Sequence, residues 1–190
     1  MDKAYEQGVI DERVFSIKFG GDDASSMITF GGYDSERFAK EELSWYPNYT
    51  PYGVHYFWAV WLEAVNIGDR SLNNFTRMAV VDSGSSYLLM PYRSFQNFVA
   101  DLQEISEAWV DDYGQAYVGC GGDLYNQLPE FTFTIGGKQY RVPRESLYKP
   151  YGWHQDNCYV EVTALPGWNE WILGLTFLEN YYAVYDMETL

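Results

Sequence analysis

Apolar and polar residues alternate or cluster along this chain in short stretches, a pattern that predicts many short β-strands and few helices. The strongest strand signal is a hairpin, in which residues 131–135 and 138–142 flank the turn Gly136-Gly137. Within a further strand at residues 14–19, the alternation predicts that Ser16 faces solvent. Other apolar runs predict strands over residues 27–30, 56–65, 77–82 and 159–163.

One long helix is expected over residues 92–108. Its apolar side chains recur every three or four positions, at Phe95, Phe98, Val99, Leu102 and Ile105. A stripe of this kind packs against a core and is not typical of a cofactor site. Shorter helices are expected at residues 2–7, stopped by Gly8, and at residues 177–179. The chain contains no internal repeat or linker, so we expect one all-β domain with a few short helices over residues 1–190.

Composition and charge narrow the classes of function. With 190 residues, 47% of them hydrophobic, the chain can bury a real core. It has 27 acidic and 12 basic residues, a net charge of −15, which argues against nucleic acid or an anionic membrane as partner. No apolar run approaches the ~20 residues that span a bilayer. Acidic conditions would titrate so many carboxylates and reduce their repulsion, which is compatible with a protein that works in acid.

Candidate chemistry is concentrated at residues 80–86, Val-Val-Asp-Ser-Gly-Ser-Ser. Here an apolar strand runs directly into Asp82, and a carboxylate at that place is costly to desolvate unless donors satisfy it. Gly84 allows a tight turn that brings amide N–H groups near, and Ser83 and Ser85 supply hydroxyls. A carboxylate held by several donors stays ionised and fixed in place, as a catalytic aspartate must. The same tripeptide also occurs in ordinary turns between strands.

Other kinds of catalytic or binding site have no support in the sequence. His55 and His154 lie far apart, and the two cysteines do not form a Cys-x-x-Cys pair, so we expect no metal. Neither a glycine-rich phosphate loop nor a Gly-x-Ser-x-Gly motif is present. We therefore expect no cofactor and no serine-hydrolase chemistry.

Five ordered motifs together resemble the C-terminal lobe of pepsin-like aspartic proteases over nearly the whole chain. They are the segment around Asp82, Phe-Gly-Gly-Tyr-Asp at 30–34, Tyr-Phe-Trp-Ala-Val at 56–60, Leu-Pro-Glu-Phe-Thr-Phe at 128–133, and Trp-Ile-Leu-Gly at 171–174 with its continuation to Asp186. The resemblance implies one lobe of the bilobal acid-protease fold. It also implies that the chain lacks the N-terminal lobe and the final C-terminal strand.

The resemblance assigns roles to the residues of the candidate site. Asp82 would be the catalytic aspartate of this lobe, with Ser83 bonding across the lobe interface, Gly84 allowing close backbone approach and Ser85 bonding the outer carboxylate oxygen. The substrate would meet Ser86, Phe57, Val80 and Ile172, although plain core packing is an alternative for the last three. One departure is Leu175, where the family usually has aspartate after Leu-Gly.

The chain would carry half of an active site. Aspartic proteolysis needs two carboxylates that share a proton, and this sequence has one Asp-[Ser/Thr]-Gly and no flap motif. We therefore expect the C-terminal lobe of an aspartic endopeptidase, which needs the N-terminal lobe of the same protease to cleave peptide or protein substrates and is inactive alone. Two alternatives remain, a homodimeric protease with one Asp82 per chain and a binding module of the same fold without catalysis.

The resemblance also implies a disulfide between Cys120 and Cys158, with two free buried thiols as the alternative. Asn48 and Asn74 each begin an Asn-x-Thr glycosylation sequon. These features favour the secretory pathway, with a secreted protein or one in an acidic, lysosome- or vacuole-like compartment.

Overall fold

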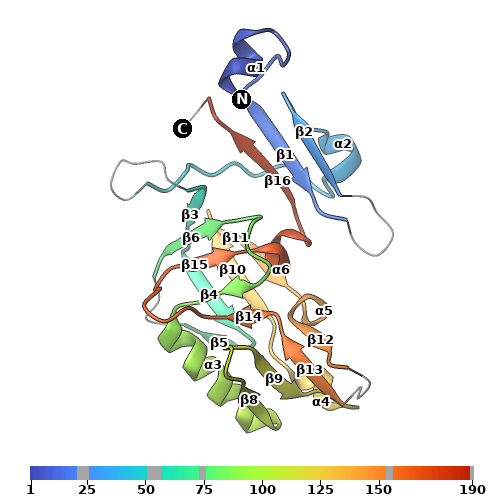
Figure 1. The fold of residues 1–190 in the computed structure, drawn as a ribbon, viewed down its shortest axis with the longest axis vertical. Helices are drawn as coiled ribbons and strands as arrows, with labels where there is room; N and C mark the ends of the chain where they lie inside the picture. Colours follow the sequence, from blue (N-terminus) through green and yellow to red (C-terminus); the bar gives the residue numbers. More distant parts are fainter. Residues whose placement is uncertain (21–25, 51–56, 73–75, 153–155, 189–190) are drawn as a thin grey trace. The chain divides into compact units, whose positions relative to one another are not determined.

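The structure is a computed structural model that describes residues 1–20, 26–50, 57–72, 76–152 and 156–188 (Figure 1). The chain forms two compact units, the first from Met1–Tyr56 with Leu178–Leu190 and the second from Phe57–Phe177. Short strands dominate the described residues, and α3 is the only helix among them longer than five residues. The all-β class with a few short helices is therefore confirmed. A single domain over residues 1–190 stays a prediction.

The first unit is built on a three-stranded antiparallel sheet in the order β16-β1-β2. Its elements are α1 (Asp2–Glu6), β1 (Val14–Lys18), β2 (Met27–Phe30), α2 (Ser35–Phe38) and β16 (Tyr182–Asp186). Gly8 follows α1 with φ +67°, the left-handed conformation that stops a helix. Asp34 caps α2 by accepting a hydrogen bond from the Arg37 amide at 3.0 Å.

Ser16 corrects the alternation predicted for β1, because its side chain is buried. Strands pair with β1 on both sides, so β1 lies in the middle of its sheet and has no edge open to solvent. The Ser16 hydroxyl accepts a hydrogen bond from the Tyr182 hydroxyl at 2.9 Å and donates to the Gly32 carbonyl at 3.3 Å. These partners offset the cost of burying a polar side chain.

The second unit contains three sheets. Their orders are β14-β7-β15-β6-β3, β11-β10-β4-β5 and β12-β13-β9-β8. The strands are β3 (Ala59–Trp61), β4 (Ala64–Ile67), β5 (Arg70–Ser71), β6 (Met78–Val81), β7 (Leu88–Leu89), β8 (Ala108–Val110), β9 (Ala116–Gly119), β10 (Phe131–Ile135), β11 (Lys138–Val142), β12 (Tyr148–Pro150), β13 (Asn157–Val160), β14 (Val162–Thr163) and β15 (Trp171–Leu173). The helices are α3 (Tyr92–Ile105), α4 (Leu124–Gln127), α5 (Arg144–Leu147) and α6, which runs over Leu175–Leu178.

Aromatic side chains form the centre of this unit. Phe131, Phe133 and Trp171 are fully buried. The Phe133 ring meets the Trp171 ring edge-on at 5.4 Å between centroids, and Phe98 of α3 meets Phe131 in the same way at 5.2 Å. Edge-to-face pairs of this kind stabilise a core beyond their buried area by about 0.5–1.5 kcal/mol each.

Two long predicted strands are each divided. The run at 56–65 separates into β3 and β4, and the run at 159–163 separates into β13 and β14, with each half in a different sheet. At the first division, the Leu62 amide donates to the Arg77 carbonyl and the Glu63 amide to the Thr134 carbonyl. The backbone thus changes partner between two consecutive residues, which an apolar run does not reveal.

The predicted hairpin is confirmed as β10 and β11, with Gly136 and Gly137 both at positive φ. Helix α3 begins at Tyr92 but ends at Ile105, three residues earlier than expected, because Ala108 already pairs with Val118. The last short helix, α6, begins two residues earlier than expected. Within the described residues, no helix has the length and apolarity needed to cross a membrane.

Candidate active site

Asp82 follows directly after the buried strand β6. Parallel pairing with β15 places Val80 beside Ile172, and antiparallel pairing with β3 places Val80 beside Ala59. The Asp82 amide donates to the Leu173 carbonyl at 3.2 Å, so the backbone of Asp82 continues this pairing by one residue. The half-buried Asp82 side chain therefore has a rigid base.

Each oxygen of the Asp82 carboxylate accepts a hydrogen bond from the loop that follows it. The Gly84 amide donates to Oδ1 at 2.9 Å, and the Ser85 hydroxyl donates to Oδ2 at 2.7 Å. A Cβ atom on Gly84 would lie 3.1 Å from Oδ1, so the absence of a side chain there permits the close approach. Ser83 and Ser86 are exposed on the same loop. The structure thus brings Asp82, Gly84 and Ser85 together as the sequence predicts.

A second segment, residues 173–176, supports this loop through its backbone. The Leu175 amide donates to the Ser85 carbonyl at 2.8 Å, and the Thr176 amide donates to the Ser86 carbonyl at 3.2 Å. The buried Thr176 hydroxyl also donates to the Ser86 carbonyl, at 3.1 Å. At Gly174, a Cβ atom would meet the Tyr87 carbonyl oxygen at 2.2 Å and that of Ser85 at 2.5 Å. Only glycine fits here without moving the loop.

Thr176 is a supporting residue that the sequence reasoning missed. The sequence gave only a weak indication of this role, because a threonine within an apolar helix does not show which group its hydroxyl will bond. The position of Gly174 after a buried strand gave a stronger signal, although the sequence could not show which backbone would lie against it.

The three predicted pocket residues differ in exposure. Val80 is buried, which favours its packing role, whereas Ile172 is half-buried. Phe57 leaves 51% of its surface exposed, two residues before Ala59. A substrate contact for Val80, Phe57, Ile172 and Ser86 stays a prediction.

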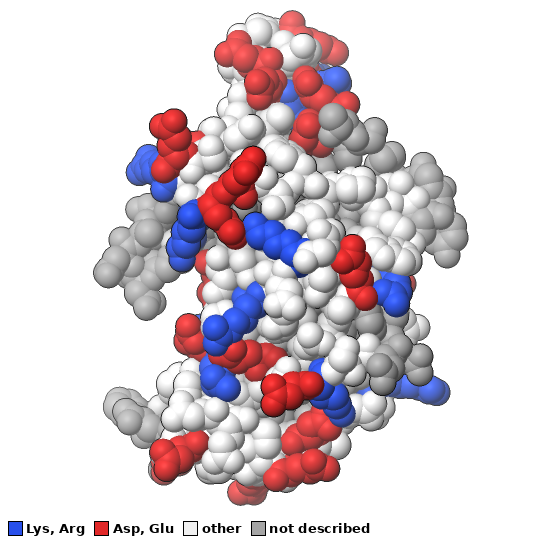
Figure 2. Space-filling view, turned by 180° about the vertical axis from the view of Figure 1, so that it is seen from behind, with Lys and Arg blue, Asp and Glu red and all other residues white. Residues whose placement is uncertain are grey.

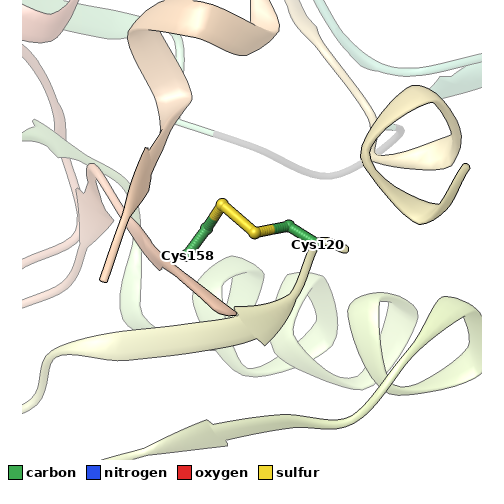
Figure 3. The surroundings of a disulfide bond; sticks show 2 residues. All are labelled: Cys120 and Cys158. Atoms are coloured by element: carbon green, nitrogen blue, oxygen red, sulfur yellow. A yellow bond between two sulfur atoms is a disulfide. The ribbon is translucent and has the colours of Figure 1, made fainter. Parts of the chain in front are cut away.

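Cys120 and Cys158 form a disulfide, as predicted, with their Cα atoms 5.8 Å apart. Figure 3 shows the bond running from the end of β9 to β13. Both cysteines are buried, and the Cys120 amide donates to the Asp156 carbonyl at 2.7 Å. The bond therefore links strands that already lie side by side.

Most of the remaining candidate residues from the sequence lie outside the part of the chain that the structure describes. Asn48 is half-buried, whereas Asn74, His55, Tyr56 and His154 lie outside the described residues. Where the structure describes the chain, no three His, Cys, Asp or Glu side chains are grouped so as to hold a metal ion.

Acidic and basic side chains are interspersed on the face shown in Figure 2. One defined cluster lies near the β10–β11 hairpin, where Glu130 accepts from Arg141 Nη2 at 2.7 Å and from Arg144 Nη1 at 3.2 Å. The hydrogen bonds from Arg141 hold the pKa of Glu130 below its usual value. Burial raises the pKa of the Tyr148 phenol, which donates to the Pro129 carbonyl at 2.8 Å. This cluster stabilises the fold and is separate in sequence from Asp82.

A carboxylate that hydrogen bonds hold in place can act as a general acid or base. A sequence model of the family described as eukaryotic aspartyl protease matches residues 1–190, and this chain belongs to that family. The described residues fit one lobe of the bilobal pepsin-like fold, as predicted.

Several curated proteins are similar to this chain. Pepsin A of Canis lupus familiaris is 30% identical over 194 residues, which cover 97% of this chain and 46% of that protein. Gastricsin of Suncus murinus is 31% identical over 192 residues, with 96% and 46% covered, and gastricsin of Homo sapiens is 30% identical over 198 residues, with 98% and 47% covered. The chain therefore spans about half the length of the curated relatives it matches.

Proposed function

We propose that this chain is the C-terminal lobe of an aspartic endopeptidase and supplies one of two catalytic aspartates, Asp82. The observation that carries the proposal is the Asp82 carboxylate, with Gly84 and Ser85 each donating to one of its oxygens. Membership of the aspartyl protease family supports the same reaction class.

The chemistry requires a second carboxylate opposite Asp82. One carboxylate takes a proton from water, and the water oxygen attacks the peptide carbonyl, while the protonated partner polarises the carbonyl oxygen. The Gly84 amide and the Ser85 hydroxyl would orient the Asp82 oxygens toward that shared proton. This sequence has one Asp-[Ser/Thr]-Gly, so the second aspartate would come from an N-terminal lobe of the same protein.

The remaining parts of the proposal follow from this assignment. The isolated chain would bind its partner lobe but not cleave peptides, because a single carboxylate cannot form the shared-proton pair. The substrate would be a peptide or protein. The disulfide supports an oxidising compartment, so we propose a secreted protein or one in an acidic lysosome- or vacuole-like compartment, with glycans on Asn48 and Asn74.

The test is the substitution Asp82→Asn in the two-lobe enzyme. Asparagine keeps the size of the side chain and still accepts hydrogen bonds, but it cannot exchange a proton with water. We expect kcat to fall by about 10²–10⁴-fold or more, with the melting temperature and the Kd for an uncleaved peptide close to wild type. Asp123→Asn, at the exposed start of α4, is the matched control and should retain full turnover.

Three other outcomes would contradict the proposal. Near-normal turnover in a well-folded Asp82→Asn enzyme would remove the catalytic role of Asp82. Peptide binding without cleavage by the wild-type two-lobe protein would favour the binding module. Cleavage by the chain alone, with a rate that rises as the square of its concentration, would favour the homodimer.

A further inference from the structure

The sheet β12-β13-β9-β8 carries a row of aromatic side chains on one face. Its register aligns Lys149, Tyr159, Tyr117 and Trp109 across the four strands. The next aligned row is Pro150, Cys158, Val118 and Ala108, in which the last three are buried. Successive residues of a strand point to opposite faces, so the aromatic row faces outward.

Two other rings, those of Trp109 and Tyr151, contact the Tyr117 ring. Trp109 stacks on Tyr117 with 5.2 Å between centroids and 10° between planes, and the Tyr151 ring meets Tyr117 edge-on at 4.9 Å. Tyr151 is 48% exposed and Trp109 36% exposed. Trp109 lies on β8, which is one of the two edge strands in the described part of this sheet. We call Trp109, Tyr117, Tyr151 and Tyr159 the aromatic platform.

A carboxylate, that of Asp111, is hydrogen-bonded to the aromatic platform. Asp111 Oδ2 accepts from the Tyr117 hydroxyl at 3.2 Å, while Oδ1 accepts from the amides of Tyr113 and Gln115, each at 2.9 Å. The hydrogen bond from the Gln115 amide is the largest cause that holds the pKa of Asp111 below its usual value. Asp111 therefore keeps its negative charge further into the acid range than an ordinary aspartate.

Tyr159 has a carboxylate, Glu161, two residues further along the chain, and Lys149 beside it in the sheet. Burial first, and then the charge of Glu161, raise the pKa of the Tyr159 phenol. Lys149, at the far end of the row, directs its ammonium group to the Glu145 carbonyl. The surface thus combines exposed aromatic faces with negative charge.

The platform is joined to the loop of Asp82 through Glu161. The Glu161 carbonyl accepts from the Leu88 amide at 3.0 Å and lies 3.3 Å from the Thr176 hydroxyl. The same hydroxyl lies 3.1 Å from the Ser86 carbonyl. Val162, three residues after Tyr159, also pairs with Leu88, which follows the Asp82 loop. The platform and the candidate active site therefore lie on neighbouring strands of the same unit.

We propose that the aromatic platform binds an arginine side chain of the peptide substrate, at a position remote from the bond that is cleaved. The proposal rests on the proposed function for the identity of the substrate. A guanidinium is flat, stacks on tryptophan and tyrosine faces, and pairs with carboxylates. The net charge of −15 on the chain disfavours a second copy of this chain or a polyanion as the occupant, and it favours a basic peptide.

The first experiment measures binding to the 190-residue chain with Asp82 unchanged. Two series of peptides share one core sequence, and arginine or the neutral isostere citrulline is moved one position at a time along extensions on either side of the core. At one position we expect arginine to bind about three- to tenfold more tightly than citrulline, as an exposed cation–π contact assisted by a carboxylate would give. An equal affinity of the two series at every position would overturn the proposal.

Variants locate the binding surface. Trp109→Thr and Tyr151→Ser remove one ring each, and both should reduce the preference for arginine to less than twofold. Tyr92→Ser, which removes an exposed tyrosine at the start of α3, is the matched control and should keep the full preference. A full preference in the folded double variant of Trp109 and Tyr151 would overturn the proposal.

A spectroscopic measurement on the wild-type chain does not depend on how those variants fold. The arginine peptide should shift the indole N–H signal of Trp109, assigned by its loss in Trp109→Phe, more than the citrulline peptide does. Equal shifts would count against the platform as the binding surface.

Kinetics on the two-lobe enzyme test whether the bound peptide is the substrate. KM should be about three- to tenfold lower for the arginine peptide, with kcat unchanged, because a remote contact stabilises the bound substrate and the transition state equally. Arginine-selective binding to the chain without this KM difference would refute the substrate role. These binding measurements use no cleavage, so they remain decisive even if the Asp82→Asn test fails.

Discussion

Removal of the disulfide should lower the free energy of unfolding by about 4 kcal/mol. Cys120 and Cys158 are separated by 38 positions in sequence. Closing a loop of that length removes about 13 cal/mol/K of entropy from the unfolded chain, which corresponds to about 4 kcal/mol at 25 °C. For a chain of this size, such a loss would lower the melting temperature by about 8–16 °C.

The folded strands should remain in place without the bond. Cys158 pairs with Val118 in the ladder between β13 and β9, and the Cys120 amide donates to the Asp156 carbonyl. The double variant Cys120→Ala/Cys158→Ala should therefore keep the wild-type far-ultraviolet circular dichroism. Alanine is the right replacement, because serine would bury an additional hydroxyl.

Urea denaturation followed by tryptophan fluorescence measures the effect. Wild-type protein reduced with dithiothreitol is the control, since it retains both sulfur atoms and loses only the covalent link. The reduced protein and the double variant should lose similar stability. A loss below about 1 kcal/mol in both, with the fold retained, would refute the argument from loop entropy.

Two further predictions concern single side chains. Gly174→Ala should lower the free energy of unfolding by about 2–4 kcal/mol, because the alanine methyl group would overlap the Ser85 and Tyr87 carbonyls and weaken the hydrogen bonds that hold the loop. Thermal unfolding measures the effect, and a wild-type melting temperature would contradict the close approach. Glu130→Gln should lower the free energy of unfolding by about 1–3 kcal/mol at pH 6, because the hydrogen bonds from Arg141 lower the pKa of folded Glu130. The difference from wild type should shrink as the pH falls below about 4.3 and through the folded pKa, because Glu130 then becomes protonated. Urea titrations at several pH values give this profile, and a difference that does not change between pH 6 and pH 3 would contradict the ion pair.

Patterns of neighbouring residues correctly predicted those elements whose backbone conformation depends on neighbouring residues alone. The β10–β11 hairpin follows from two alternating strands around two glycines, and both glycines have the positive φ that the turn requires. The start of α3 after Pro91 and the position of Asp82 after β6 follow from equally local patterns. In each case the residues that determine the structure are neighbours in sequence.

The divided strands could not be predicted in this way, because their form depends on a change of partner. β3 pairs with β6 and β4 with β10, while β13 pairs with β9 and β14 with β7. A glutamate lies at each division. The Glu63 amide donates to the Thr134 carbonyl, and the Glu161 amide donates to the Leu147 carbonyl. A charged residue inside an apolar run was the available signal, since it cannot remain in a fully buried strand without a partner.

Leu175 shows why the departure from the family pattern does not weaken the candidate site. Its contribution to the Asp82 loop is the backbone amide, which donates to the Ser85 carbonyl at 2.8 Å and which any residue except proline supplies. Gly174 is different, because the Ser85 and Tyr87 carbonyls occupy the space that a side chain would need. The support of the loop therefore constrains the backbone shape at Gly174, whereas at position 175 it uses the backbone amide. The family motif includes both positions, but the geometry requires a particular residue only at Gly174, where no side chain fits.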